Sequence, residues 1–312
     1  MAAQQTVDVS GWEVAAFEQM GSKAGKLWLE APPQAPVEQG RWLFKARTLQ
    51  RENGRCFPKG DDWAEKLAGE VAVRLAIPSA RVEMVTRQGE VGTISHDISG
   101  GLNLVSGNEV LFGQDSDYDR RGRRSVPGYT VEAIMDALRA LRVSAPVGES
   151  TGDACSVFAG YLLLDAVVGN TDRHHENWGV LVAADGGAPP ALAATFDHAS
   201  SLGFQLSDGE RHERLTTHDR NRTVQAYAER GQSRPFDGSP RLLELALAGL
   251  RHCTAATRHT YRARLKAFDE TAIVGVLAAM PQTRWSPVAA AFAGKLIQVN
   301  RRRLLDAFDH QA

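Results

Sequence analysis

The chain has 312 residues, 43% of them hydrophobic, and a formal net charge of −1 at pH 7. Such a chain has enough apolar surface for a sizeable core, and without an overall positive field we expect no direct binding to nucleic acid. Cys56, Cys155 and Cys253 are too widely spaced to indicate disulfides or a zinc site. No apolar run approaches twenty residues and no secretory leader is visible, so we expect a cytoplasmic protein without a membrane segment.

Glycine and lysine are concentrated before the first clear strand. Gly21, Ser22 and Lys23 precede the apolar run at residues 27–29, which we interpret as a strand. A turn whose backbone amides and lysine approach a phosphate group would serve to cover a nucleotide. An ordinary surface turn has the same composition, so this stretch alone does not identify a phosphate site.

The next segments predict a strand, a loop and a helix. Residues 41–46 alternate between polar and apolar side chains, with Lys45 near the end of the strand. The loop expected at residues 47–62 is rich in glycine, proline and charge. Residues 62–76 have an apolar side chain at every fourth position, which predicts a helix with one apolar face. Glu65 and Glu70 are the two glutamates within this helix. By themselves, Lys45 and Glu70 could simply be charged side chains that face solvent, so the pattern alone assigns them no function.

The remaining pattern divides the chain into a small sheet-rich part and a larger helical part. Strands expected at residues 80–85 and 90–95 complete a small antiparallel sheet, and the glycine-rich stretch from Ser95 to Gly101 is the expected hinge. We expect further helices at residues 130–141, 153–168, 241–250, 256–268 and 286–308, and a strand pair at residues 178–183 and 191–196.

The most polar run in an apolar neighbourhood extends from Gly169 to Trp178. It follows the end of an expected buried helix and leads into the strand pair. Because an antiparallel hairpin brings its two ends together, Asn177 and Asp197 should be neighbours, and Asp172 should face the same space. Two carboxylates and an amide oxygen suit Mg²⁺ that carries phosphate groups better than they suit zinc.

Phosphoryl transfer requires the residue types found in this stretch. One carboxylate orients or deprotonates the acceptor hydroxyl, while an asparagine and a second aspartate hold the metal against the phosphates. The spacing of Asp172 and Asn177, followed by a hairpin and Asp197, is the catalytic-loop and metal-binding layout of protein-kinase-like folds. Asp172 is therefore the expected catalytic residue, and Asn177 and Asp197 are the expected metal ligands. Arg173 and His174 are expected to shape the loop.

The stretches Asn170–Trp178 and Phe196–Leu202 resemble the HipA-like serine/threonine kinases, bacterial proteins of toxin–antitoxin systems and their short relatives. A less specific resemblance extends from about Gly21 to Phe308. It implies a two-lobed, protein-kinase-like α+β fold, in which residues 1–97 form a small antiparallel-sheet N-lobe and residues 98–312 form a mostly helical C-lobe. We expect no counterpart in this sequence of the extra N-terminal subdomain that full-length HipA toxins carry.

The resemblance also implies ligands and roles. It implies ATP and Mg²⁺ as cofactors, a serine or threonine hydroxyl of a protein as the phosphate acceptor, and an antitoxin as a partner. Lys45 would contact the phosphates and be braced by Glu70, and Ser22 is the candidate for autophosphorylation. The remaining nucleotide-binding positions that it implies are Gly21 and Lys23 over the phosphates and backbone groups of Ser95, His96 and Asp97 at the adenine.

Other functions remain open on the sequence. The pattern Asp-Arg-His-x-x-Asn is shared with phosphatidylinositol 3- and 4-kinases, which keeps a lipid or small-molecule kinase as an alternative. A pseudokinase acting as a binding module is opposed by the retained lysine, aspartates and asparagine. A metal-dependent hydrolase would not require Lys45, and it would use residues drawn from Asp172, His174, His175, Asp197 and His198.

Overall fold

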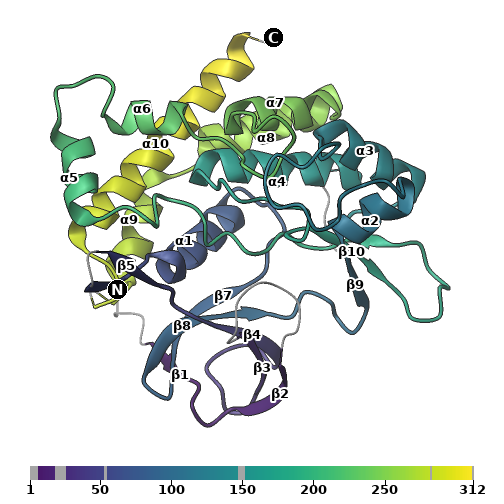
Figure 1. Ribbon diagram of the computed structural model, residues 1–312, viewed down its shortest axis with the longest axis horizontal. Coiled ribbons are helices and arrows are strands. Elements are labelled where there is room, and N and C mark those ends of the chain that lie inside the picture. The colour runs from purple at the N-terminus through teal and green to yellow at the C-terminus, as the bar shows by residue number, and fades with distance from the viewer. Residues whose placement is uncertain (1–5, 18–25, 53–54, 147–151, 282, 311–312) are drawn as a thin grey trace.

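A computed structural model describes residues 6–17, 26–52, 55–146, 152–281 and 283–310. Figure 1 shows a sheet-rich lobe below and a helical lobe above, with helix α1 between them. The expected two-lobed α+β fold is confirmed. The turn at Gly21, Ser22 and Lys23 lies outside the described residues. Within the described ranges, no helix is long and apolar enough to cross a membrane.

The N-lobe is a curled sheet in which the strand order is β1-β7-β8-β4-β3-β2. Only the β1–β7 pair is parallel among the described strands of this sheet. Trp42 and Phe44 alternate along β4 and pack with Leu29 and Ile94 in a separate small core. The strands are β1 (Val7–Asp8), β2 (Glu13–Phe17), β3 (Lys26–Ala31), β4 (Gly40–Ala46), β7 (Val82–Arg87) and β8 (Glu90–His96).

The segment expected as a loop at residues 47–62 contains a two-stranded sheet instead. Strands β5 (Leu49–Glu52) and β6 (Arg55–Pro58) pair antiparallel. Leu49 and Phe57 remain 63% and 48% exposed. Because these two apolar side chains are exposed, they do not mark a buried strand face, and the sequence here lacks the alternation that normally identifies a strand.

Helix α1 (Asp61–Arg74) lies between the N-lobe sheet and the helical lobe. The expected apolar face is present: Trp63, Leu67 and Val71 are all buried. The acidic first turn of this helix, Asp61 and Asp62, is favourable beside the exposed amides of a helix N-terminus.

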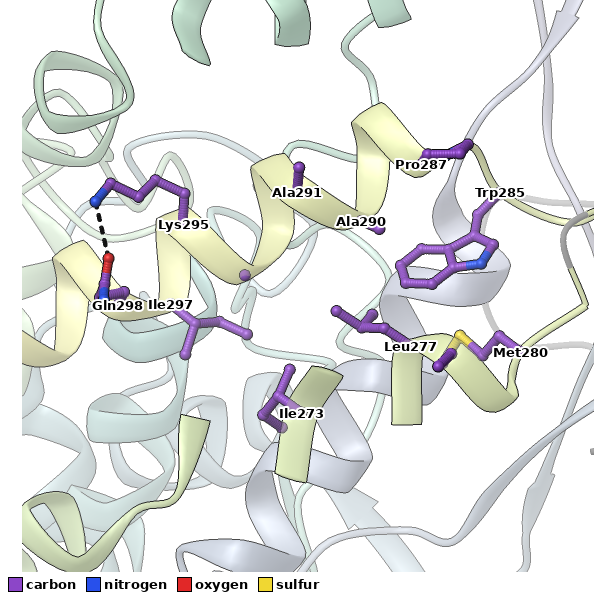
Figure 2. A pocket seen from close by; sticks show the side chains of 12 residues that line it. Ile273, Leu277, Met280, Trp285, Pro287, Ala290, Ala291, Lys295, Ile297 and Gln298 are labelled. Carbon is purple, nitrogen blue, oxygen red and sulfur yellow. Dashed lines mark hydrogen bonds between the residues drawn. The ribbon is translucent and has the colours of Figure 1, made fainter. Parts of the chain in front are cut away.

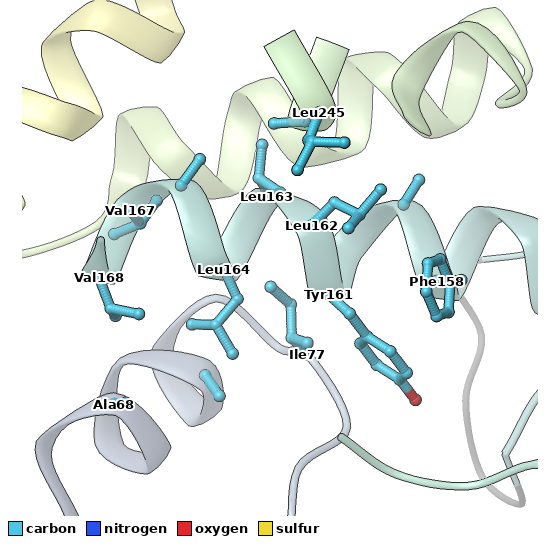
Figure 3. Packing of buried hydrophobic residues seen from close by; sticks show 14 of the residues in the cluster. Ala68, Ile77, Phe158, Tyr161, Leu162, Leu163, Leu164, Val167, Val168 and Leu245 are labelled. Atoms are coloured by element: carbon cyan, nitrogen blue, oxygen red, sulfur yellow. The ribbon is translucent and has the colours of Figure 1, made fainter. Parts of the chain in front are cut away.

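Helix α4 (Ala154–Val168) is the centre of the C-lobe, and every one of its residues is buried. Full burial of a valine, leucine or phenylalanine side chain contributes about 1.5–3 kcal/mol. Figure 3 shows Leu164 directed toward α1 and Leu163 directed toward α7 (Leu242–Arg251). Gly169, with φ of +69°, ends the helix in the left-handed conformation that glycine adopts easily and releases the chain into the polar loop.

The other helices surround α4. The expected helices at residues 130–141, 256–268 and 286–308 correspond to α3, α8 and α10, whereas short helices α2, α5, α6 and α9 were not expected. An apolar groove of about 550 Å³ lies between α9 and α10 (Figure 2). The bounds are α2 (Gly107–Gln114), α3 (Val131–Ala140), α5 (Asp208–Thr216), α6 (Val224–Glu229), α8 (Ala255–Ala267), α9 (Glu270–Ala279) and α10 (Pro287–His310).

A small sheet supports the polar loop. The expected hairpin is present as β10 (Gly179–Val182) and β11 (Ala191–Leu192), which pair antiparallel. On its other side β10 pairs with β9 (Asn103–Ser106), a strand that the sequence did not predict. The hairpin therefore starts directly after the polar loop and is fixed on both edges of its first strand.

Candidate active site

A buried ion pair anchors the polar loop to α4. Asp165, the one acidic residue of this otherwise apolar helix, accepts hydrogen bonds from Arg173 Nε and Nη2, each at 2.7 Å. Asn170 Nδ2 donates to the same carboxylate at 2.8 Å. Burial alone would lower the pKa of Arg173, but the charge of Asp165 outweighs it and raises that pKa. The loop is thus held at its start by a fully paired charge.

The same arginine extends its support to the expected metal ligand. Arg173 Nη1 donates to the carbonyl oxygen of Asn177 at 2.8 Å, and Asn177 Nδ2 donates to the carbonyl oxygen of Asp172 at 2.9 Å. The hydroxyl of Tyr129 donates to the carbonyl oxygen of Arg173 at 3.0 Å. Because the amide nitrogen of Asn177 is used within the loop, its amide oxygen is the atom that would bind a cation.

Asp197 lies against two lysines of the N-lobe. Lys45 Nζ is 2.8 Å from Asp197 Oδ1, and Lys26 Nζ is 3.9 Å from Oδ2. Lys26 and Lys45 are direct partners in the β3–β4 register. Burial would raise the pKa of Asp197, but Lys45 and then Lys26 outweigh it and hold that pKa far below its ordinary value. Lys26 was not among the predicted site residues.

The pKa of Lys45 is raised because negatively charged carboxylates lie close to its ammonium group. Burial opposes its charge, yet the negative charges of Asp197 and Glu65 outweigh that effect. Asp197 also has a φ of +55°, an uncommon conformation for a residue other than glycine. Strained backbone of this kind occurs at functional sites more often than elsewhere.

Backbone contacts bring the polar loop beside the segment after the hairpin. Thr171 N donates to the carbonyl oxygen of Ser200 at 3.3 Å, and Ser200 Oγ lies 3.5 Å from Asp172 Oδ2. Burial lowers the pKa of His174, while the charges of Asp172 and Asp197 oppose that shift. Both carboxylates therefore act on one imidazole, and the structure gathers the loop and Asp197 at one place.

The helix glutamate that faces Lys45 is Glu65, and the expected pairing with Glu70 is wrong. Glu70 instead binds Arg74 Nη1 at 2.7 Å and Lys66 Nζ at 3.1 Å. Five residues of α-helix turn the side chain by about 140° from the starting face. Glu65 is 3% exposed, and its Oε1 accepts a hydrogen bond from His198 N at 2.9 Å, next to Asp197.

The hinge residues are largely engaged with the sheet. Ser95 and His96 belong to β8, where the His96 ring packs on Trp42 with centroids 4.8 Å apart. The amide of His96 donates to Arg81 O at 2.8 Å, and the amide of Asp97 donates to Arg41 O at 2.9 Å. These two amides are therefore already paired, and an adenine role for this stretch would use its other backbone groups.

Two of the histidines considered for a hydrolase are tied to neighbours inside the protein. His175 is 1% exposed, and its Nδ1 lies 2.7 Å from the hydroxyl of Tyr118. His198 Nε2 lies 3.0 Å from the hydroxyl of Thr195, also buried. These contacts give both imidazoles a structural role behind the loop.

The oxygen ligands present fit magnesium. Among the described residues, no three His, Cys, Asp or Glu side chains converge as a metal cluster. Mg²⁺ is usually held by one or two carboxylates, with the remaining positions taken by phosphate oxygens and water. Asp197 and the amide oxygen of Asn177 are hard oxygen donors of the required type.

Comparison with solved structures shows a protein-kinase-like fold. No family model and no curated protein matches the sequence. The proinflammatory kinase CtkA of Helicobacter pylori is similar over 97% of each chain, with 15% identity and a TM-score of 0.71. HipA of a Shewanella oneidensis MR-1 toxin–antitoxin system, solved with HipB and operator DNA, is similar over 96% of this chain and 68% of that chain, with 13% identity and a TM-score of 0.55. The chain therefore has the two-lobed fold of these kinases.

Proposed function

We propose that the protein is an ATP- and Mg²⁺-dependent kinase that transfers the γ-phosphate to a serine or threonine hydroxyl of a protein. The observation that carries the proposal is the 2.8 Å contact between Lys45 Nζ and Asp197 Oδ1. It joins a strand lysine of one lobe to a carboxylate at the polar loop of the other. In a nucleotide complex, Lys45 would contact phosphate oxygens, and Asp197 with Asn177 would hold Mg²⁺.

Asp172 is the proposed catalytic residue. Its carboxylate would accept a hydrogen bond from the acceptor hydroxyl and orient it, or take its proton. The hydroxyl of Ser200 lies 3.5 Å from Asp172 Oδ2, so this carboxylate already faces an alcohol group of the protein itself. Mg²⁺, when bound, would neutralise negative charge on the phosphates.

The finer parts of the proposal follow the resemblance. The HipA structure similar to this chain was solved with HipB, which supports an antitoxin-type protein partner here. A toxin role, a cytoplasmic location and autophosphorylation of Ser22 belong to the same proposal. The phosphate-covering role of Gly21, Ser22 and Lys23 also remains a prediction.

Transfer from γ-labelled ATP to proteins of a bacterial lysate tests the activity. General-base or positioning groups contribute about 10²–10⁴-fold to rate, so Asp172→Asn should lose that much while it still binds Mg²⁺-ATP. Asp197→Asn should lose transfer and also the dependence of ATP affinity on Mg²⁺, measured by calorimetry with and without the metal. Asp185→Asn, in the exposed β10–β11 turn, is the control.

Two results would contradict the proposal. Full label transfer by Asp197→Asn would remove the metal site from this place. Loss of metal-dependent ATP binding in Asp172→Asn but not in Asp197→Asn would reverse the roles of the two carboxylates.

A further inference from the structure

Arg284 is a buried arginine in the turn between α9 and α10, and the proposed chemistry does not use it. The residue is 5% exposed. Its Nε and Nη2 lie 3.0 and 2.9 Å from Asp62 Oδ2 at the start of α1. Its Nη1 and Nη2 donate to the carbonyl oxygens of Val85 and Gly92, at 3.0 and 2.7 Å. One side chain from the C-lobe thus binds both the sheet and the helix of the N-lobe.

The two carbonyl groups belong to Val85 and Gly92, which lie in a row of cross-strand partners next to Lys45. Val85 pairs with Gly92, and Gly92 pairs with Ala46, so the row crosses β7, β8 and β4. Gly92 lies so close to β4 that a Cβ atom on it would be 2.3 Å from the carbonyl oxygen of Lys45. Since packed interiors transmit displacement, movement of Gly92 shifts the backbone that carries Lys45.

The same turn also restrains the start of α1. Asp62 and Glu65 are three residues apart, a spacing that places both side chains on one helix face. The ring of Trp285 lies 6.1 Å from the ring of Trp63, measured between centroids. Figure 2 shows Trp285 beside Leu277 of α9, and both residues line the same apolar groove. Arg284 and Trp285 therefore both contact the first turn of α1, the helix that carries Glu65.

A charged side chain is a costly way to fill this space. Removing a guanidinium from water costs several kcal/mol unless its donors are paired. An apolar residue would serve for packing alone, whereas a planar guanidinium offers several donors in fixed directions. We propose that Arg284 is a positioning residue that keeps Lys45 and Glu65 in place for nucleotide binding, a role that rests on the proposed kinase function.

A double-mutant cycle with Lys45 tests the proposal. The dissociation constant of Mg²⁺-ATP is measured by calorimetry for the unmodified chain, Arg284→Met, Lys45→Met and the double variant. We expect Arg284→Met to weaken binding about tenfold in the unmodified chain and less than twofold in the Lys45→Met background. Residues that act through one another show such coupling, whereas independent losses add.

Arg301→Met is the matched control. Arg301 lies on α10, and its Nε and Nη2 donate to the carbonyl oxygens of Leu265 and Lys266 at 2.7 and 2.9 Å, all within the C-lobe. Its loss should leave the dissociation constant within twofold. Arg284→Lys, which keeps a cation near Asp62 but lacks the planar fork, is the variant to use if Arg284→Met does not fold. It should bind nucleotide about threefold to tenfold more weakly than the unmodified chain.

The outcomes separate the two proposals. An unmodified chain that binds no Mg²⁺-ATP overturns both. An unmodified chain that binds it, with equal losses from Arg284→Met in both backgrounds, overturns only the positioning role. Nucleotide binding by Arg284→Lys that equals that of the unmodified chain also overturns it.

Discussion

The polar loop and the surroundings of Lys45 are built in opposite ways. The charged anchor of the loop comes from neighbours in sequence: Asp165, near the end of α4, binds Asn170 and Arg173, and Arg173 binds the carbonyl oxygen of Asn177. Lys45 is held by Asp197, Glu65 and, through Gly92, the Arg284 turn, which come from distant parts of the chain. The charged anchor of the loop is therefore local in sequence, whereas the position of Lys45 depends on contacts between the two lobes.

This difference separates two kinds of defect. Damage to the loop network leaves a charge or polar group buried without a partner, and so reduces the stability of the fold. Damage around Lys45 changes the contact between Lys45 and Asp197 across the two lobes and should therefore weaken the proposed binding of nucleotide. The following predictions run from the largest expected effect to the smallest.

Asp165→Asn should disrupt the buried ion pair that anchors the polar loop to α4. It leaves Arg173 buried without a counter-charge, which costs about 3–5 kcal/mol in the free energy of unfolding. Urea denaturation measures the loss. Asp136→Asn is the control, because Asp136 has a 77% exposed side chain on α3 and should change stability by less than about 0.5 kcal/mol. A loss below about 1 kcal/mol for Asp165→Asn would show that the ion pair does not anchor the loop.

His175 should make the loop region sensitive to acid. Burial lowers the pKa of His175 to about 4 from 6.5. The unfolded chain therefore binds a proton below pH 6.5 while the folded chain does so only near pH 4, so stability falls as the pH falls through this window. The loss reaches about 3 kcal/mol, at about 1.4 kcal/mol for each pH unit.

Unfolding at a series of pH values checks this expectation. His175→Asn, which retains an acceptor for Tyr118, should reduce the slope between pH 6.5 and 4. The lowered pKa of His174, caused by burial, contributes to what remains. His218→Asn, at an exposed position, should leave the slope as it is. An unchanged slope in His175→Asn would refute the assignment.

Lys45→Ala tests the contact between the lobes. A hydrogen bond to a charged group contributes about 1.5–3 kcal/mol, so kcat/KM for ATP should fall about 10- to 100-fold. Lys26→Ala should have a smaller effect, since its Nζ lies 3.9 Å rather than 2.8 Å from Asp197. Steady-state kinetics on both variants decides, and a larger loss from Lys26 would make that residue the principal phosphate ligand.

Glu65→Gln and Glu70→Gln should have the smallest effects on kcat/KM. Their comparison tests which of the two glutamates acts on Lys45. Glu65→Gln removes a negative charge that acts on Lys45 but keeps an oxygen for the amide of His198, so kcat/KM should fall about tenfold. Glu70→Gln, which faces Lys66 and Arg74, should stay within twofold. The reverse order would restore the interpretation drawn from the sequence.

The contrast between the two regions also explains what the sequence predicted. The core helices of the C-lobe and the hairpin were found because apolar periodicity is local, and Asp172 and Asn177 were named because their motif is contiguous. Asp165 was missed as the anchor of the loop, although a single charge within Leu162–Val168 was a visible signal.

The missed features depend on contacts between distant segments. Helical periodicity places Glu65 and Glu70 on one helix but does not say which face meets β4, because tertiary packing decides that. Strand β9 forms only by pairing with β10, far along the chain. Arg284 lies more than two hundred residues after Lys45, and no local pattern connects them.

Helix α10 sets the order in which the site is completed during synthesis. Asn300 Nδ2 donates to the carbonyl oxygen of Val167 at 3.1 Å, and so pairs a carbonyl in the last turn of the helix that carries the loop. Translation at about 5–20 residues per second needs on the order of ten seconds to pass from Asp172 to Asn300. During that interval the nascent chain contains the whole polar loop but lacks the helix that pairs the carbonyl group of Val167 at the end of α4. A growing chain would therefore complete the packing around the end of α4 late, after all the strands of the N-lobe sheet have been made.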